Sequence, residues 1–383
     1  MRSRFRSVLA VVALAAIAAG CTMTYQGNAG HTGAYPVTMK LPLSQAWTAS
    51  FDGPPSYAVV AGGLAFVTAK GPGSGYGTVL HAIDVQTGHD RWSAPLGATY
   101  WWSALATDAD TVYAVNYNGL LQAFRAADGT VRWSIQLPGQ YSFSSAPTVR
   151  DGRLFVGGAG SGGTLYAVDT TNGALLWTVG VANGDNSSPS VSKDTVFVSY
   201  ACNFTYAFAV STGALRWHST PPCSGGGGKT TVYDEQTDSL FVRDVATGAA
   251  LQLDASTGAV RHSYLLGTAP AIGAHASYVV HGGTLTSVAL SSGLINWNMA
   301  GDGTLSTAPI VVGDYVLVGA TSGNLYAFDA TSGARRWSTN VGASIPGPDE
   351  QNVSQPLAGL AQGYGLVFVP TTTGKLIAYK ATP

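Results

Sequence analysis

Residues 165–180, with the sequence LYAVDTTNGALLWTVG, decide the fold because their pattern recurs along most of the chain. The run from residue 165 to 168 is rich in residue types that favour β-strands. Asp169 offers a side-chain hydrogen-bond acceptor and Gly173 tolerates a positive φ, so together they predict a tight hairpin turn. Trp177 follows on the returning strand. The stretch therefore predicts a β-hairpin with tryptophan on its second strand.

This hairpin is one copy of a repeat with a period of about 40 to 45 residues, the spacing of propeller blades. Its consensus is Ala-x-Asp-x-x-x-Gly-x-x-x-Trp, with drift at the first two positions. The tryptophans that end the six complete copies are Trp92, Trp133, Trp177, Trp217, Trp297 and Trp337. A seventh copy has Gln252, Asp254 and Gly258 in register and His262 in place of the tryptophan.

A second hairpin precedes each copy, so every repeat supplies four antiparallel strands, A to D, with the tryptophan on strand D. Eight C strands can be counted, but the last unit, residues 375–379, stops before its own D strand. Residues 43–47 precede the first repeat and carry Trp47 without a local partner. Pairing these two segments closes the ring and removes an open edge. We therefore predict an all-β, eight-bladed propeller; an open solenoid or two small sandwiches would leave Trp47 unexplained.

Composition agrees with many short strands and tight turns, since 49 residues are glycine and only 10% of the chain is charged. The formal net charge of −1 argues against a nucleic-acid partner, which needs clustered Lys and Arg. The histidines are scattered without metal-ligand spacing. No motif pairs a nucleophile with its base, so the sequence assigns no metal site and no catalytic residue.

Residues 1–20 have the features of an export signal. Three arginines precede the apolar run of residues 8–19, which is shorter than the roughly 20 residues that span a bilayer. Residues 17–21, IAAGC, resemble the lipobox of bacterial lipoproteins, in which the cysteine carries acyl chains such as palmitate. Ordinary cleavage, with Cys21 as an incidental thiol, is the alternative. Thr22 resembles the residue that follows the cysteine in lipoproteins sent to the outer membrane.

These features divide the chain into a lipoprotein signal peptide at residues 1–20, an N-terminal tether at residues 21–36 and a propeller at residues 37–383. We expect the mature protein to be exported and anchored by lipid on Cys21. The expected location is the outer membrane, on the side that faces the periplasm.

The repeat resembles the pyrroloquinoline-quinone (PQQ)-like propeller repeat, whose tryptophan docking motif has the same consensus. In that family the tryptophan of one blade packs near the small alanine of its neighbour, which implies a structural role for Trp47 and the six repeat tryptophans. Residues 27–33, GNAGHTG, resemble a Gly-x-x-x-His-Thr-Gly stretch that precedes many such propellers. The lipobox, the eight blades and the length are similar to BamB-type outer-membrane assembly lipoproteins.

Quinone-dependent dehydrogenases use the same repeat, so the resemblance is also compatible with an enzyme. It implies adjacent cysteines over the quinone, a Ca²⁺ held by Glu, Asn and Asp, and an Asp base. No two cysteines are adjacent here. We therefore favour a non-enzymatic envelope protein that binds a protein partner and needs no cofactor. The alternatives are a periplasmic oxidoreductase using PQQ with calcium, and a carbohydrate or cell-wall binder.

Cys202 and Cys223 map to the same face of the propeller, one in a B-to-C hairpin and the other in a D-to-A connection. A disulfide needs Cα atoms about 4.4 to 6.8 Å apart, which this placement permits. We predict a structural disulfide between them.

The same face collects aromatic, amide and acidic residues just before the A strands. Loops on a rigid scaffold commonly carry binding residues, and aromatic residues are enriched among interface anchors. The predicted binding residues are Tyr100, Trp101, Trp102, Tyr141, Phe143, Asn186 and Asp302, with residues 349–355 nearby. For Trp101 and Trp102 the alternative is that one of the pair fills the central channel.

Overall fold

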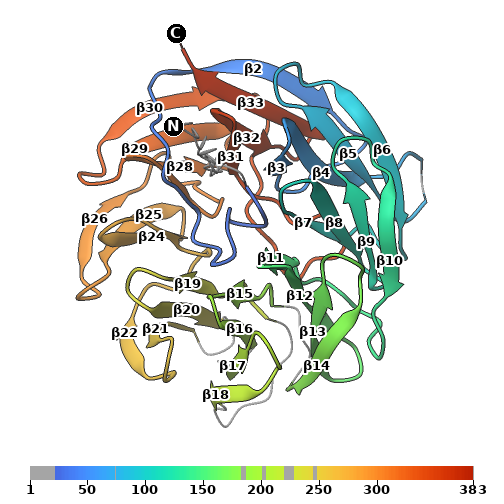
Figure 1. Ribbon diagram of the computed structural model, residues 1–383. Coiled ribbons are helices and arrows are strands. Elements are labelled where there is room, and N and C mark those ends of the chain that lie inside the picture. The colour runs from blue at the N-terminus through green and yellow to red at the C-terminus, as the bar shows by residue number, and fades with distance from the viewer. Residues whose placement is uncertain are drawn as a thin grey trace, which may run out of the picture.

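The computed structural model describes residues 22–73, 75–182, 187–200, 204–219, 228–244 and 248–382. Over these ranges the chain forms strands and turns without a helix. None of these ranges contains a helix with the length and apolarity needed to cross a membrane. Eight four-stranded antiparallel blades surround a central axis (Figure 1). The predicted all-β, eight-bladed propeller is confirmed.

The first seven blades follow one another in chain order, each running from inner strand A to outer strand D. Blades 1 to 4 are β3 (Val59–Ala61), β4 (Leu64–Lys70), β5 (Thr78–Asp84), β6 (Asp90–Gly97); β7 (Ser103–Thr107), β8 (Thr111–Asn116), β9 (Leu120–Arg125), β10 (Val131–Gln136); β11 (Thr148–Arg150), β12 (Arg153–Ala159), β13 (Gly163–Asp169), β14 (Leu175–Val181); and β15 (Ser190–Val191), β16 (Thr195–Tyr200), β17 (Phe204–Ala209), β18 (Leu215–Ser219). Blades 5 to 7 are β19 (Val232–Asp234), β20 (Ser239–Asp244), β21 (Ala249–Asp254), β22 (Val260–Ser263); β23 (Ala271–Ile272), β24 (Ala276–His281), β25 (Thr284–Ala289), β26 (Ile295–Met299); and β27 (Ile310–Val312), β28 (Tyr315–Gly319), β29 (Asn324–Asp329), β30 (Arg335–Asn340).

Blade 8 joins the two ends of the chain. It consists of β31 (Ala361–Gly363), β32 (Leu366–Pro370), β33 (Lys375–Ala381) and, as its outer strand, β2 (Leu43–Ser50). The two strands pair antiparallel from Leu43 opposite Ala381 to Ser50 opposite Lys375, and Figure 1 shows blue β2 alongside red β33. The predicted closure by an N-terminal strand is confirmed.

Alternating strand directions give the ring two distinct faces. The A-to-B and C-to-D turns lie on one face, called the turn face here, and the B-to-C hairpins and D-to-A connections lie on the other, the loop face. Residues 22–35 form a segment, called the plug, that crosses the middle of the ring in Figure 1. Its last two residues are β1 (Ala34–Tyr35), which pairs in parallel with β27.

The repeat tryptophans connect consecutive blades. In blade 3, Trp177 pairs across the sheet with Ala167 of its own blade, and a register shift follows. Six indole N–H groups donate to a carbonyl in the next blade at 2.8–3.0 Å. These donors and their acceptors are Trp47 to Val85, Trp92 to Ala126, Trp133 to Thr170, Trp177 to Val210, Trp217 to Ala255 and Trp297 to Thr331. Trp337 lies edge-on to Tyr379, with ring centroids 5.9 Å apart.

A turn glycine of the next blade leaves room for each docked ring. A Cβ added to Gly88 would lie 2.7 Å from the Trp47 ring, and the φ of Gly88 is +75°. Gly62 has a φ of +58° with nothing near its added Cβ. His262 takes the tryptophan's place in blade 5, against Gly293.

These two glycines form a matched pair for a stability test. We expect Gly62→Ala to lower the free energy of unfolding by about 1–2 kcal/mol, because of its left-handed backbone alone. Gly88→Ala should cost about 1–3 kcal/mol more, since it also displaces Trp47. Urea denaturation of both variants measures the difference; equal losses would mean that the Trp47 contact contributes nothing at the ring closure.

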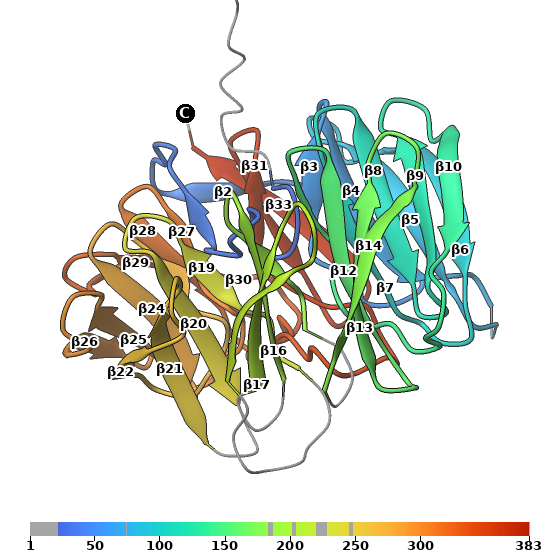
Figure 2. The ribbon, with the colours of Figure 1, turned by 60° about the horizontal axis from the view of Figure 1, so that its bottom comes forward.

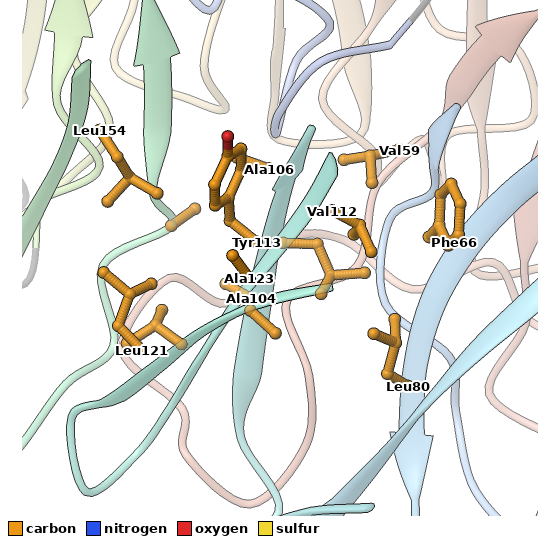
Figure 3. Close-up of a cluster of buried hydrophobic side chains, with 14 of the residues drawn as sticks. Val59, Phe66, Leu80, Ala104, Ala106, Val112, Tyr113, Leu121, Ala123 and Leu154 are labelled. Carbon is orange, nitrogen blue, oxygen red and sulfur yellow. The ribbon is translucent and has the colours of Figure 1, made fainter. Parts of the chain in front are cut away.

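Apolar side chains fill the spaces between adjacent blades. Figure 3 shows one such cluster, with Phe66 of blade 1, Tyr113 of blade 2 and Leu154 of blade 3. The three side chains are at most 1% exposed. The continuous packing makes a rigid ring, so the loops and the plug are held at fixed positions around the axis.

Candidate functional site

The plug makes hydrogen bonds to all eight blades within the central channel. From blade 1 to blade 8 these are Val60 N to Thr22 O, Thr107 N to Met23 O, Thr24 Oγ1 to Pro147 O, Val191 N to Ala29 O, Tyr233 N to Gly30 O, Ile272 N to Thr32 O, Val311 N to Gly33 O and Thr22 Oγ1 to Gln362 O, at 2.6–2.8 Å. The backbone donors come from the A strands, which have no other strand on their inner side. The segment that the sequence suggested only as a tether thus satisfies the inner edges of the blades.

His31 is a polar side chain of the plug with no exposed surface. Its Nδ1 lies 2.6 Å from the carbonyl oxygen of Tyr25 and its Nε2 lies 2.8 Å from that of Pro189. The Thr148 hydroxyl is 3.0 Å from the same Nε2. Burial lowers the pKa of His31, although the two carbonyls oppose this effect. The ring therefore links the plug to blades 3 and 4.

An ion pair between Arg243 and Glu350 lies buried where blade 5 meets the connection into blade 8. The guanidinium Nη2 is 2.7 Å from Glu350 Oε1, and both side chains are 4% exposed. Glu350 Oε2 accepts a hydrogen bond from the backbone N–H of Thr230. Burial raises the pKa of Glu350, but Arg243 and then Lys229 outweigh burial and hold that pKa below its ordinary value. A cavity of about 290 Å³ beside the pair is lined by Lys229, among other residues.

The low pKa of Glu350 makes a prediction about acid stability. A carboxyl whose pKa is lower in the folded state stabilises the fold above its unfolded pKa, and that contribution is lost as the pH falls through the folded value. We expect the melting temperature to fall below about pH 4.5, with a smaller acid dependence in Glu350→Gln than in the wild type. Thermal melts from pH 3 to pH 7 measure both. Identical pH profiles would show that Glu350 does not contribute.

On the loop face, an exposed aromatic cluster lies where blades 1 and 2 meet. Tyr100 is 41% exposed and its ring is 4.6 Å from that of Tyr117. Trp101 lies 5.0 Å from Tyr76, donates to the Gly75 carbonyl at 2.9 Å and has the Lys70 ammonium over its ring at 4.5 Å. The cluster is therefore held in place from several sides and still offers aromatic surface to solvent.

The other predicted binding residues are distributed differently. Trp102 and Phe143 have no exposed surface and pack into the hydrophobic core, so they do not belong to the accessible part of the loop face. The alternative for Trp101 and Trp102, that one of them fills the central channel, stays a prediction. Asn186 lies outside the described residues.

Two predicted residues remain accessible away from the aromatic cluster. Tyr141 is 65% exposed and donates to the Gly160 carbonyl at 2.7 Å. Asp302 accepts hydrogen bonds from Asn324 and Thr304 at 2.7 and 2.8 Å and from Ser322. Partial burial raises the pKa of Asp302, but these hydrogen bonds outweigh it and hold the pKa well below its ordinary value. Its carboxylate is already satisfied within its own blade.

The three cysteines lie outside the described residues. Neither acylation of Cys21 nor the bond between Cys202 and Cys223 is therefore visible in the structure. Both stay predictions from the sequence.

Comparison with known proteins identifies the repeat. The family profile described as "Outer membrane protein assembly factor BamB" matches residues 75–229 and 206–383. The chain belongs to this family. The BamB protein of Yersinia pestis is 26% identical over 304 residues, which cover 71% of this chain and 72% of that protein. The BamB protein of Shewanella oneidensis is 26% identical over 273 residues, covering 64% of this chain and 60% of that protein.

Solved structures support the fold of the BamB family and extend beyond it. BamB from Moraxella catarrhalis superposes with a TM-score of 0.68 at 16% identity, covering 88% of this chain and all of that one. A europium-containing methanol dehydrogenase superposes with a TM-score of 0.72 at 13% identity, covering 94% and 98%. At these identities the likeness concerns the fold alone. The choice between a BamB-like role and a dehydrogenase must come from the site.

A quinone with calcium would need free carboxylate and amide oxygens in the channel. No group of three or more His, Cys, Asp and Glu that could hold a metal ion occurs among them. In the channel, both oxygens of Glu350 already have partners, Arg243 and the Thr230 N–H. The plug also occupies the turn-face end of the channel of this BamB-family chain. We therefore derive no catalytic step through PQQ.

Sequence reasoning singled out the region of Glu350 but not its role. The carboxylate lies within the stretch 349–355, while Arg243 lies 107 residues away and had no distinguishing motif. An arginine directly after the apolar run of residues 240–242 in a B strand is the signal that could have found it, because a buried charge needs a partner. His31 stood within the GNAGHTG stretch, and its separation of 158 residues from Pro189 has no local signature.

Proposed function

We propose that this chain is an exported, non-enzymatic envelope lipoprotein whose loop face binds another protein during assembly of outer-membrane proteins. The observation that carries the proposal is the match of the BamB family profile to nearly all of the repeat region. The relative from Yersinia pestis is named as an outer membrane protein assembly factor.

Charge and packing in the channel support a binding role over catalysis. The one carboxylate of the Arg243–Glu350 pair is neutralised by its arginine, so it is poorly suited to act as a base. Exposed aromatic residues such as Tyr100 and Tyr141 gather instead on the loop face, where they are suited to anchor a protein partner.

Affinity capture from envelope extract tests the proposal. We expect the mature protein to recover a reproducible envelope protein, and Tyr100→Ser combined with Tyr141→Ser to reduce the recovery about tenfold, as loss of interface anchors does. Tyr364→Ser is the matched control, because Tyr364 is 51% exposed on the turn face. Failure to recover any reproducible partner, or equal losses in the control, would contradict the loop-face proposal.

The enzyme alternative is favoured by one observation, the structural likeness to methanol dehydrogenase. Reconstitution with PQQ and Ca²⁺, followed by dye reduction with alcohols and sugars, tests it. We expect no dye reduction above that of the cofactor alone. Turnover that depends on the protein would replace the binding proposal.

Two covalent features complete the proposed function. We propose lipid on Cys21, which intact-mass measurement of the membrane-extracted protein tests. We also propose a disulfide between Cys202 and Cys223. A count of two free thiols on the unreduced mature protein would contradict the disulfide.

A further inference from the structure

We propose that the turn face of the propeller rests on the lipid bilayer that carries the acyl chains of Cys21. The orientation rests on the proposed lipid anchor and goes beyond it, because an anchor alone does not fix which surface meets the membrane. Three observations point to the turn face: where the plug begins, where the exposed aliphatic side chains lie, and how the charges beside them are paired.

The first residue of the plug is already fixed to the blades. Thr22 is 1% exposed, its hydroxyl donates to the Gln362 carbonyl at 2.6 Å, and its own carbonyl accepts from Val60 N at 2.8 Å. Both partners lie next to A-to-B turns, in β31 and β3, so Thr22 is fixed at the turn face. In Figure 2 the blue N-terminal segment lies on the same upper side of the ring as the end of β31. A trans peptide places neighbouring Cα atoms only about 3.8 Å apart, so an acylated Cys21 must hold this face close to the membrane.

Exposed aliphatic side chains form a rim on the same face. They occupy the first positions after the C-to-D turns, where strand D begins, in blades 2 to 6. The members of this aliphatic rim and their exposures are Val131 49%, Leu175 42%, Leu176 42%, Leu215 51%, Val260 60%, Leu294 69% and Ile295 52%. The corresponding residues of blades 1 and 7 are charged, so the apolar rim is an arc and not a complete ring.

The two faces differ in the kind of apolar residue that they expose. Among the described residues, the large hydrophobic side chains exposed on the loop face are tyrosines: Tyr76, Tyr100 and Tyr141. The turn face exposes the aliphatic rim and Tyr364, which is 51% exposed in the A-to-B turn of blade 8. Aliphatic side chains enter the acyl region of a bilayer and tyrosine suits its interface. The turn face therefore matches a lipid surface better than the loop face does.

The arginines next to the rim residues of blades 2, 4 and 5 are paired within the protein. Arg132 is 2.6 Å from Asp110, and Arg261 is 2.6 Å from Asp254. The rim therefore carries little uncompensated positive charge for anionic headgroups. The expected contact is apolar, tolerates salt and does not require anionic lipid.

Depth-dependent quenching tests the orientation. The full acylated protein, with Cys202 and Cys223 changed to serine, carries an NBD fluorophore on Leu294→Cys or on Leu176→Cys at the rim, or on Tyr141→Cys at the loop face. It is reconstituted in phosphatidylcholine vesicles that contain a nitroxide lipid. We expect quenching at both rim positions to exceed that at Tyr141→Cys by about threefold or more, in low and high salt alike.

A longer tether supplies the control. Inserting about ten Gly and Ser residues between Cys21 and Thr22 allows an end-to-end distance of roughly 16–19 Å, and the rim quenching should fall while the protein still floats with the vesicles. Equal quenching on the two faces, or stronger quenching at Tyr141→Cys, in an acylated protein that floats would overturn the orientation and leave the anchor intact. A mature protein without lipid that does not float would overturn the anchor and the orientation together.

Discussion

Replacing His31 by alanine is expected to lower the free energy of unfolding by about 3–5 kcal/mol, the range of large buried side-chain deletions. The substitution removes a ring without exposed surface and leaves the carbonyl that accepts the ring N–H, that of Tyr25 or of Pro189, without its donor. Unsatisfied buried acceptors are destabilising in addition to the lost packing. Urea denaturation followed by tryptophan fluorescence measures the change.

His89→Ala is the matched control, because His89 is exposed in the C-to-D turn of blade 1. Its effect should stay within about 0.5 kcal/mol, as for most surface substitutions. His31→Gln, which keeps one amide donor, should fall between the two. If His31→Ala and His89→Ala shift the urea midpoint equally, the plug does not stabilise the ring through this side chain.

Replacing Glu350 by alanine should cost about 3–5 kcal/mol, because it leaves Arg243 as a buried charge without a counterion. Arg243 is only 4% exposed and cannot reach water without rearrangement. Urea denaturation measures this loss as well. High salt should restore part of the free energy of unfolding only if the site opens so that ions can reach Arg243.

Glu235→Ala provides the comparison, since the Glu235 side chain is 70% exposed and lies 3.7 Å from Arg150. Such surface pairs contribute at most about 1 kcal/mol. Combining Arg243→Met with Glu350→Leu should recover much of the loss, because apolar pairs replace buried ion pairs at little cost. A double variant as unstable as Glu350→Ala would mean that the loss reflects packing of the connection and not the unpaired charge.

The ring could be predicted from the sequence because the residues that define each hairpin lie close together along the chain. Asp169, Gly173 and Trp177 lie within nine residues, and similar spacing recurs in most blades, so that one repeat contains the turn, the strand and the docking residue. The closing strand could also be predicted, since Trp47 stood without a hairpin of its own.

The interior could not be predicted in the same way. The plug is rich in Gly and Thr, a composition that suggests a tether, yet its main-chain groups bind the blades. Main-chain hydrogen bonds leave little trace in side-chain identity. The full burial of Trp102 and the only partial burial of Trp101 also depend on which way a short connection turns between two blades. Contacts such as Arg243 with Glu350 join segments far apart along the chain.

The order in which the chain is synthesised gives the plug a further consequence. Residues 22–50 are made early, but β2 pairs with β33 and Thr22 bonds to Gln362, 340 residues later. This early segment is thus among the last to find its native partners. Long-range closure of this kind is slow. Until it occurs, the inner edges of the blades remain unsatisfied, and chaperones have a defined interval in which to act.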